Sequence, residues 1–199
     1  MARGRLRDLS RLQLGFDDLT ALVRAFGAGE HPIAVAILGA VIVEHDLEQL
    51  LRARLKRKDN QTWAMLTDER GPLNSFSSMI AMGYALGIYD QGMRSDLDIV
   101  RHIRNAFAHS RKLIHFDHPA VVAELKKATR WAKRDLSLQF KGRVDDKYAA
   151  QHFYAILCLR LSSKITKIEG RRIRSRTHRL ERKTEAINLL LAGLPKIKR

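Results

Sequence analysis

The stretch Pro32-Ile-Ala-Val-Ala-Ile-Leu-Gly-Ala-Val-Ile-Val43 decides the fold, because it is apolar on nearly every side. Pro32 suits the first turn of a helix, where a missing backbone N–H leaves no hydrogen bond unmade. After Val43 the chain becomes amphipathic, and the pattern ends in the basic run Lys56-Arg-Lys-Asp-Asn. We therefore predict one long helix that begins at Pro32 and whose first half lies at the centre of a helical core.

Apolar residues recur at the 3.6-residue spacing of α-helices on both sides of this stretch, and no segment alternates convincingly as a strand would. The sequence therefore predicts an all-α fold, a single compact multi-helix domain. Besides the long helix, helical segments are expected at about 17–26, 63–66, 75–89, 96–109, 119–140, 145–168 and 177–191.

Polar residues mark where two of the central helices should begin. Asn74 or Ser75 can cap the helix that reaches residue 89, since both side chains accept hydrogen bonds from free N–H groups. Gln91-Gly92 is expected to break the chain's helical path. Ser95, with Asp98 three residues later, resembles a capping box for the following helix.

Charge is distributed very unevenly along the 199 residues, whose net charge is +16. Residues 1–100 carry 12 Lys/Arg and 13 Asp/Glu, whereas residues 101–199 carry 25 Lys/Arg and 8 Asp/Glu. Such asymmetry indicates a polyanionic partner: nucleic acid, an acidic protein or an anionic membrane surface. We divide the chain into a basic N-terminal arm (1–16), a helical domain (17–169) and a basic C-terminal helical extension (170–199).

Several classes of protein are disfavoured. The longest apolar run has eleven residues, whereas a helix that crosses a bilayer needs about 20, and no signal-peptide core follows the basic N-terminus. Cys158 lies in an apolar run, which predicts a buried thiol in a reducing compartment, and we expect a cytoplasmic protein. His115 and His118 lack a third ligand nearby, so we expect neither a metal site nor a cofactor.

Three stretches taken together resemble the mannitol operon repressor family: residues 36–55, residues 71–88, and Asp96-Leu-Asp-Ile-Val-Arg-His-Ile-Arg-Asn-Ala-Phe-Ala-His-Ser followed by Phe116-Asp-His-Pro. The resemblance covers roughly residues 32–168 and does not extend to the basic C-terminal stretch. It implies a compact helical fold and a role in transcriptional regulation exerted through a protein partner. The sequence itself shows no helix-turn-helix pair with a base-reading face.

A second, narrower resemblance lies within the third stretch. Arg104-Asn-Ala-Phe-Ala-His109 fits the Arg-x4-His motif of the HEPN superfamily, many of whose helical members are metal-independent RNases. That resemblance implies catalytic roles for Arg104, Asn105 and His109, with sites from two protomers paired at a dimer interface. Histidine can transfer the proton and arginine can hold the phosphate.

Helical geometry limits how this motif can act. Arg104 and His109 are about 140° apart around the helix and about 7.5 Å apart along it, so one helix cannot align them on one stripe. The predicted buried face is formed by Ile99, Val100, Ile103 and Phe107, and a polar stripe is formed by His102, Asn105 and His109. We prefer a structural interpretation, in which the Arg-Asn pair bonds loop carbonyls near the helix end and His-Ser caps that end.

The C-terminal stretch carries the densest positive charge. Residues 171–183 contain seven Lys/Arg and no aromatic residue, which favours sequence-independent contact with a phosphate backbone over base stacking. The candidate nucleic-acid-binding residues are Arg171, Arg172, Arg174, Arg176, Arg179, Arg182 and Lys183. A solvated helix face is the alternative.

Two main functional hypotheses result, and a third possibility, a purely structural nucleic-acid-associated module, rests only on the charge. The first is a regulatory or interaction protein similar to the mannitol repressors, with a protein partner or a second copy of the chain, and no enzymatic activity. The alternative is a HEPN-type RNase that uses Arg104 and His109 across a dimer. Both are compatible with weak, non-specific nucleic-acid binding, and neither involves a membrane.

Overall fold

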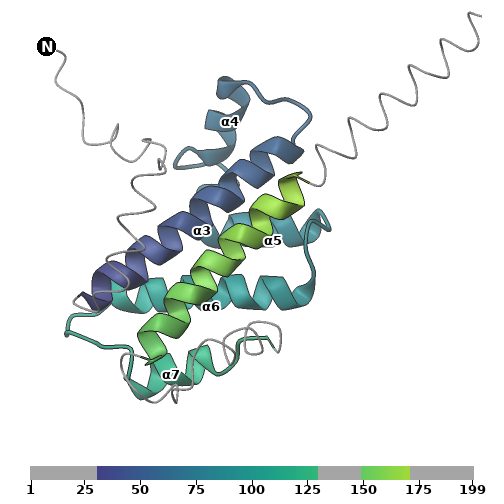
Figure 1. Cartoon of the computed structure of the whole chain (residues 1–199). Helices are drawn as coiled ribbons and strands as arrows, with labels where there is room; N and C mark the ends of the chain where they lie inside the picture. The colour runs from purple at the N-terminus through teal and green to yellow at the C-terminus, as the bar shows by residue number, and fades with distance from the viewer. Residues whose placement is uncertain (1–30, 130–148, 171–199) are drawn as a thin grey trace, which may run out of the picture.

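The computed structural model describes residues 31–129 and 149–170, and these residues form helices, turns and loops without a strand. The all-α prediction is therefore confirmed for this part of the chain (Figure 1). Residues 149–170 are helical throughout. The other helices are α3 (Pro32–Arg54), α4 (Asn60–Thr67), α5 (Phe76–Ala85), α6 (Gln91–His109) and α7 (Pro119–Leu125).

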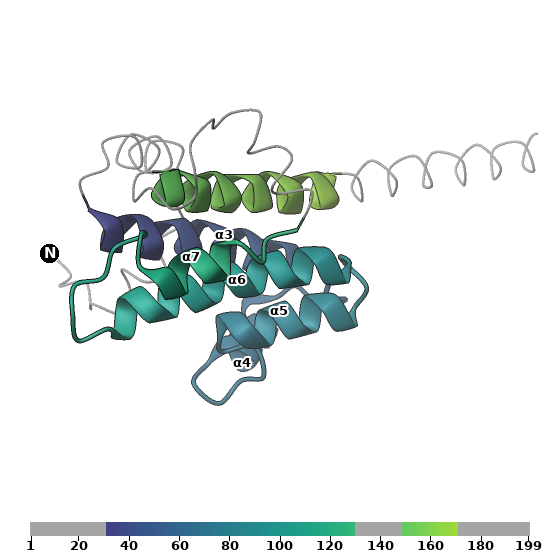
Figure 2. The same cartoon turned by 90° about the horizontal axis from the view of Figure 1, so that it is seen from below.

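Helix α3 occupies the centre of the fold, as its apolar sequence predicts. The helix of residues 149–170 lies along it (Figures 1 and 2). From this helix the hydroxyl of Tyr154 donates a 2.7 Å hydrogen bond to the carbonyl oxygen of Ala36 on α3. A Cβ atom on Gly39 would lie 3.1 Å from the Sγ atom of Cys158, so the glycine permits this close approach. Cys158 is buried, as predicted, and burial raises the pKa of its thiol to about 12.

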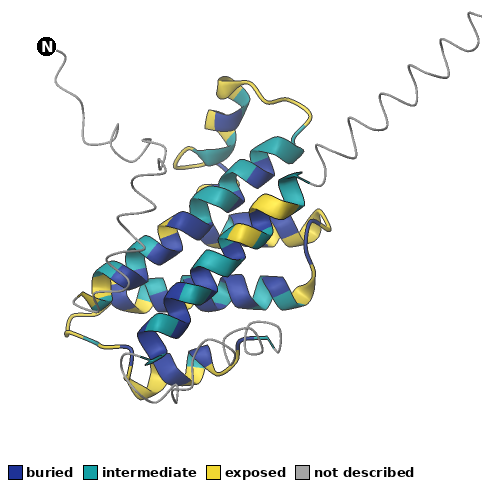
Figure 3. Ribbon diagram, viewed as in Figure 1, coloured by how far each residue is buried: buried dark blue, intermediate teal, exposed yellow. Residues whose placement is uncertain are grey.

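Helix α6 packs against α3 and α5, while α4 and α5 lie on the side away from residues 149–170 (Figure 2). The predicted buried face of α6 is confirmed, because its four apolar residues are all buried: Ile99, Val100, Ile103 and Phe107. Figure 3 colours each residue by its burial. At the end of this face, Phe107 stacks on Phe116 with ring centroids 4.7 Å apart, and Phe116 lies 5.3 Å from the ring of Tyr154. These rings attach the α6–α7 connection to the core.

The predicted start of α6 is wrong by five residues. Asp90 caps the helix by accepting a 2.8 Å hydrogen bond from the N–H of Met93, so the helix begins at Gln91 and includes Gly92. Ser95 does not cap; its hydroxyl donates to the carbonyl oxygen of Gln91 inside the helix. Because Asp90 accepts a hydrogen bond from a free N–H group of the first turn, α6 begins about one turn before the position that a cap at Ser95 would give.

Helix α5 begins as predicted and ends early. Ser75 and Ser78 form a capping box in which each side chain accepts a 3.2 Å hydrogen bond from the other's backbone N–H. The helix stops at Ala85 because Gly87 adopts a φ of +62°, which turns the chain back. Tyr89 therefore lies outside the helix, and its hydroxyl donates to the carbonyl oxygen of Ile80.

The other predicted ends vary in accuracy. Helix α3 ends just before the basic run, as predicted, and α4 extends over eight residues where one short turn was expected. Helix α7 stops at Leu125, well short of residue 140, and the chain turns so that Thr129 bonds to Asp96 on α6. Three predicted segments lie outside the described residues: the basic arm 1–16 and the helices at 17–26 and 177–191. None of the described helices is long and apolar enough to span a bilayer.

Candidate functional site

Arg104 and Asn105 lie half-buried on α6 beside α3. The Nη1 atom of Arg104 donates a 3.0 Å hydrogen bond to the Oδ1 atom of Asn105. Burial raises the pKa of Glu44 on α3, and the positive charge of Arg104 acts in the opposite direction. Among the described residues the Arg104 side chain thus bonds to its neighbour Asn105 and not to a loop carbonyl as predicted, and its charge acts on Glu44 without forming an ion pair.

His109 occupies the last turn of α6 and is exposed. None of the described residues forms a hydrogen bond with its imidazole. Of the predicted His-Ser cap, Ser110 supplies the bonds: its N–H bonds to the carbonyl oxygen of Ala106, and its hydroxyl bonds to the backbone of Lys112. A structural interpretation therefore suits Arg104 and Asn105, which bond to each other, but it does not extend to the His109 side chain. No contact among the described residues joins Arg104 to His109.

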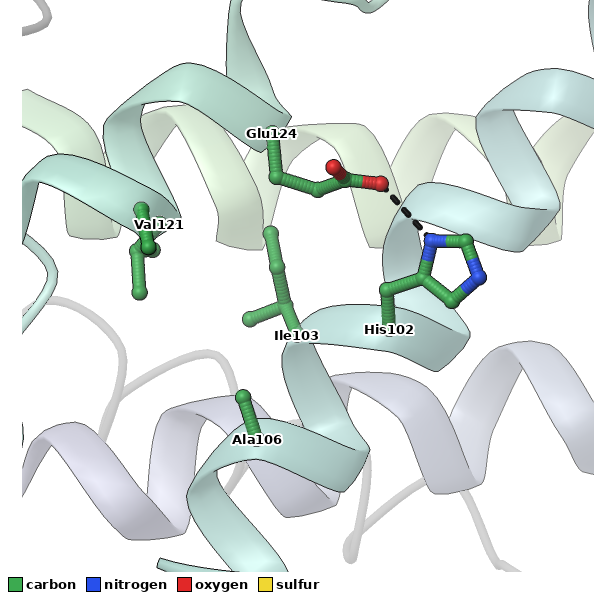
Figure 4. Close-up of a pocket in the computed structure, with 6 residues that line it drawn as sticks. His102, Ile103, Ala106, Val121 and Glu124 are labelled. Carbon is green, nitrogen blue, oxygen red and sulfur yellow. Dashed lines mark hydrogen bonds and ion pairs between the residues drawn. The ribbon is translucent and has the colours of Figure 1, made fainter.

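A cleft that sequence reasoning did not identify lies between α6 and α7 (Figure 4). Its volume is about 170 Å³, and its polar end is a pair formed by His102 and Glu124, with Nδ1 of the histidine 2.7 Å from Oε1 of the glutamate. Figure 4 shows both side chains directed toward one another from the two helices. The lining residues are His102, Ile103, Ala106, Ala120, Val121 and Glu124.

The polar atoms of this pair are already occupied. The Nζ atom of Lys127 donates a 2.6 Å hydrogen bond to Oε2 of Glu124, and the Nη2 atom of Arg101 lies 2.7 Å from Nε2 of His102. Burial alone would raise the pKa of Glu124, but the hydrogen bonds that its carboxylate accepts from Lys127 and His102, together with the positive charge of Lys127, lower it overall. An ionised Glu124 makes Nδ1 of His102 the donor, and Nε2 then accepts from Arg101. This arrangement fastens α7 to α6 and leaves no free base in the cleft.

Helix α5 presents an uncharged surface to solvent. Residues 71–89 contain no Asp, Glu, Lys, Arg or His, in a chain whose charged fraction is 29%. Leu86 is 52% exposed, and the ring of Tyr84 lies under the guanidinium of Arg94 at 4.7 Å. We call this surface the α5 face; its exposed residues are Ala81, Met82, Tyr84, Ala85 and Leu86. The absence of charged residues from 71–89 can be read from the sequence. Periodicity alone, however, does not show which side of α5 is exposed to solvent.

The remaining predicted sites give less information. Within residues 31–129 and 149–170, no cluster of three or more His, Cys, Asp or Glu residues could hold a metal ion. His118 caps α7 instead, because its Nδ1 accepts a 3.3 Å hydrogen bond from the N–H of Ala120. The seven predicted nucleic-acid-binding residues between 171 and 183 lie outside the described part of the chain.

Comparison with known proteins identifies no relative. No protein-family model, no curated protein and no solved structure matches the chain.

Proposed function

We propose that this protein is a regulatory protein of the mannitol-repressor type, which acts in transcriptional regulation by binding a protein partner through the α5 face. The observation that carries the proposal is the exposed, uncharged surface of Met82, Tyr84 and Leu86 on a helix without a single charge. The same residues belong to stretch 71–88, one of the three that resemble the mannitol operon repressors.

Physical chemistry favours a protein as the occupant of this surface. Contiguous apolar surface exposed to water is unfavourable and often marks an interaction site. The centres of protein interfaces are enriched in Tyr, Met and Arg and depleted in Lys and Glu. Tyr84, Met82 and Arg94 fit that composition, and the contact between Arg94 and Tyr84 holds the aromatic ring in place.

Site-specific crosslinking in cells tests the proposal. A photoreactive amino acid replaces Met82 or Leu86, and a matched control carries it at Leu113, which is 82% exposed in the α6–α7 connection. Positions 82 and 86 should yield a discrete crosslinked protein, and position 113 should not. Leu86→Asp should abolish the crosslink from position 82 and should reproduce the transcript profile of a strain that lacks the protein.

Two results would contradict the proposal. One is the same crosslinked species from positions 82, 86 and 113, and the other is a Leu86→Asp strain whose transcripts match the wild type. A crosslink to a second copy of the chain would instead identify the α5 face as a self-association surface.

A HEPN-type RNase is the second candidate, and one observation favours it. His109 is exposed and forms no hydrogen bond among the described residues, while Asn105 holds Arg104 by its Nη1 atom. A free imidazole and an oriented guanidinium are the groups that phosphodiester cleavage requires, if a second protomer supplies the missing partner. The nuclease test described in the Discussion separates the two candidates.

A further inference from the structure

The cleft between α6 and α7 is a fixed feature of the fold, because polar contacts hold the two helices together (Figure 4). His102 on α6 and Glu124 on α7 meet at 2.7 Å, and Lys127 donates to the second carboxylate oxygen of Glu124. Two of the apolar lining residues, Ile103 and Val121, are 1% and 5% exposed and belong to the hydrophobic core. A ligand that enters this cleft would therefore not have to order it on binding.

Alanine at two positions of the lining leaves room in the cleft. Ala106 on α6 and Ala120 on α7 are both exposed. The volume of about 170 Å³ is close to that of an engineered protein cavity of about 150 Å³ that binds benzene. Figure 4 shows the Ile103 side chain between Val121 and the polar pair. The cleft thus suits one small apolar group with a polar head.

The charges around the polar pair balance. Lys127 bonds to Glu124. The Nη2 atom of Arg101 lies 2.7 Å from Nε2 of His102, and the guanidinium forms a 3.2 Å ion pair with Asp98. A ligand ammonium would be repelled by Lys127 and Arg101, and a ligand carboxylate would be repelled by Glu124. This network of two cations and two carboxylates therefore favours an uncharged head group.

Hydrogen-bonding capacity decides which uncharged group fits. A carboxylate has about four lone-pair sites. That of Glu124 uses two of them, for His102 and Lys127. The His102 ring has no donor left, since its Nδ1–H bonds to Glu124 and its Nε2 faces Arg101. The other lining side chains are apolar, so the lining offers acceptors and no donor.

We propose that the cleft binds a small, uncharged apolar molecule that carries a hydroxyl group, and that the hydroxyl donates to the carboxylate of Glu124. The apolar body of the ligand contacts Ile103, Ala106, Ala120 and Val121, where it is removed from water. The site binds without catalysing, because the cleft holds no free base. It is separate from the α5 face and does not depend on the regulatory role proposed for that surface.

Methyl-resolved NMR of the full-length protein tests the site, with benzyl alcohol as the probe. The methyl signals of Ile103, Ala106 and Val121 should shift during the titration. The methyl signals of Ile80 should not, since Ile80 is buried on α5 and does not line the cleft. A dissociation constant of about 1 mM is expected for a ligand of this size.

Three matched compounds test the head group. Benzylamine carries a cation, benzoate carries an anion, and the oxygen of anisole cannot donate a hydrogen bond. Each should bind at least about tenfold more weakly than benzyl alcohol, because it loses a hydrogen bond to a charged acceptor or places an unfavourable charge in the cleft.

Ala106→Leu tests the cleft itself. The larger side chain should fill the apolar part and abolish the shifts of Ile103 and Val121. Ala108→Leu adds the same side chain about 200° away around α6, so this matched control should bind as the wild type does. Both replaced alanines are exposed and leucine is a good helix former, so the melting temperatures should stay close to that of the wild type.

Four outcomes would overturn the inference. Unshifted methyl signals with all four compounds would show that the cleft binds no ligand of this class. Equal shifts in Ala106→Leu and the wild type would place benzyl alcohol elsewhere. Anisole that binds as tightly as benzyl alcohol would show that donation to Glu124 contributes nothing. Tighter binding of benzylamine or benzoate would show that charge selects the ligand.

Discussion

The Nδ1 atom of His102 on α6 lies 2.7 Å from the Oε1 atom of Glu124 on α7, and this contact closes one end of the cleft between the two helices. Helix α7 has seven residues, too few to be stable without tertiary contacts. Its buried side chains, Val121, Val122 and Leu125, supply part of that stabilisation. The hydrogen bond between His102 and Glu124, with Lys127 on the second carboxylate oxygen, fixes the position of the helix along α6.

Glu124→Gln should make stability less sensitive to acid. The pKa of Glu124 is lowered in the folded state, so its ionised form stabilises the fold above the ordinary value of 4.5. That contribution is lost as the pH falls through the folded-state pKa. Urea denaturation from pH 7 to pH 3 should therefore show a wild-type advantage over Glu124→Gln that shrinks below pH 4.5. Identical pH profiles for Glu124→Gln and the wild type would contradict this role.

Asp96→Ala should destabilise the protein more than Asp96→Asn. Asp96 is 1% exposed, and its carboxylate accepts hydrogen bonds of 2.9 and 2.8 Å from the N–H and hydroxyl of Thr129. Alanine removes both acceptors, which should lower the free energy of unfolding by about 1–3 kcal/mol. Asparagine retains an acceptor without a buried charge. Urea denaturation at pH 7 measures both variants.

The pH dependence of the Asp96 variants provides an independent check. Burial raises the pKa of Asp96, and hydrogen bonds from Thr129 reduce that rise only in part. A raised folded-state pKa means that the folded protein binds the proton more tightly than the unfolded chain does. Wild type should therefore lose stability relative to Asp96→Asn as the pH rises from 3.8 through the folded-state pKa. A constant difference across that range would show that burial does not perturb Asp96.

The interior of α6 was predictable from the sequence because burial follows helical periodicity. Ile99, Val100, Ile103 and Phe107 recur at the required spacing, and each is buried. The first residue of α6 was not predictable from the sequence, because Asp90 and Ser95 are both good caps. The choice between them depends on where the preceding turn ends.

The cleft was not predictable, although its residues are ordinary in type. His102 and Glu124 are 22 residues apart, and they meet only because the connection through Phe116 directs α7 back across α6. The same limit applies to α3 and the helix of residues 149–170, where Tyr154 bonds to Ala36 and Ser162 bonds to Asp46 across more than 110 residues of sequence. Sequence patterns specify which face of a helix is buried; they do not specify which distant side chains then become neighbours.

Arg104→Ala should lower stability, and Glu44→Gln should partly restore it. The guanidinium of Arg104 opposes the effect of burial on the Glu44 carboxylate, so its removal leaves a half-buried charge without its compensating partner. We expect a loss of about 1–3 kcal/mol in the free energy of unfolding. Arg104→Lys should lose less, because it keeps the charge but not the bond to Asn105. If Arg104→Ala/Glu44→Gln is no more stable than Arg104→Ala, the two charges do not interact in this way.

His109→Ala provides the sharpest test between the two candidate functions. Because His109 is exposed and bonds to none of the described residues, its replacement should leave the melting temperature unchanged. Any change in nuclease activity can then be assigned to chemistry rather than to unfolding. His115→Ala is the matched control, since His115 is also exposed but lies outside the Arg-x4-His motif.

The assay follows a quenched fluorescent RNA in the presence of EDTA, with wild type, His109→Ala, His115→Ala and Arg104→Lys. A regulatory protein that acts through the α5 face should produce no cleavage above background in any of the four samples. An RNase should cleave without metal, lose activity in His109→Ala and Arg104→Lys, and keep it in His115→Ala, because proton transfer and phosphate binding need the specific imidazole and guanidinium. That second pattern would replace the regulatory proposal with the nuclease, and it would require a second protomer to complete each site, since Arg104 and His109 are about 140° apart on α6.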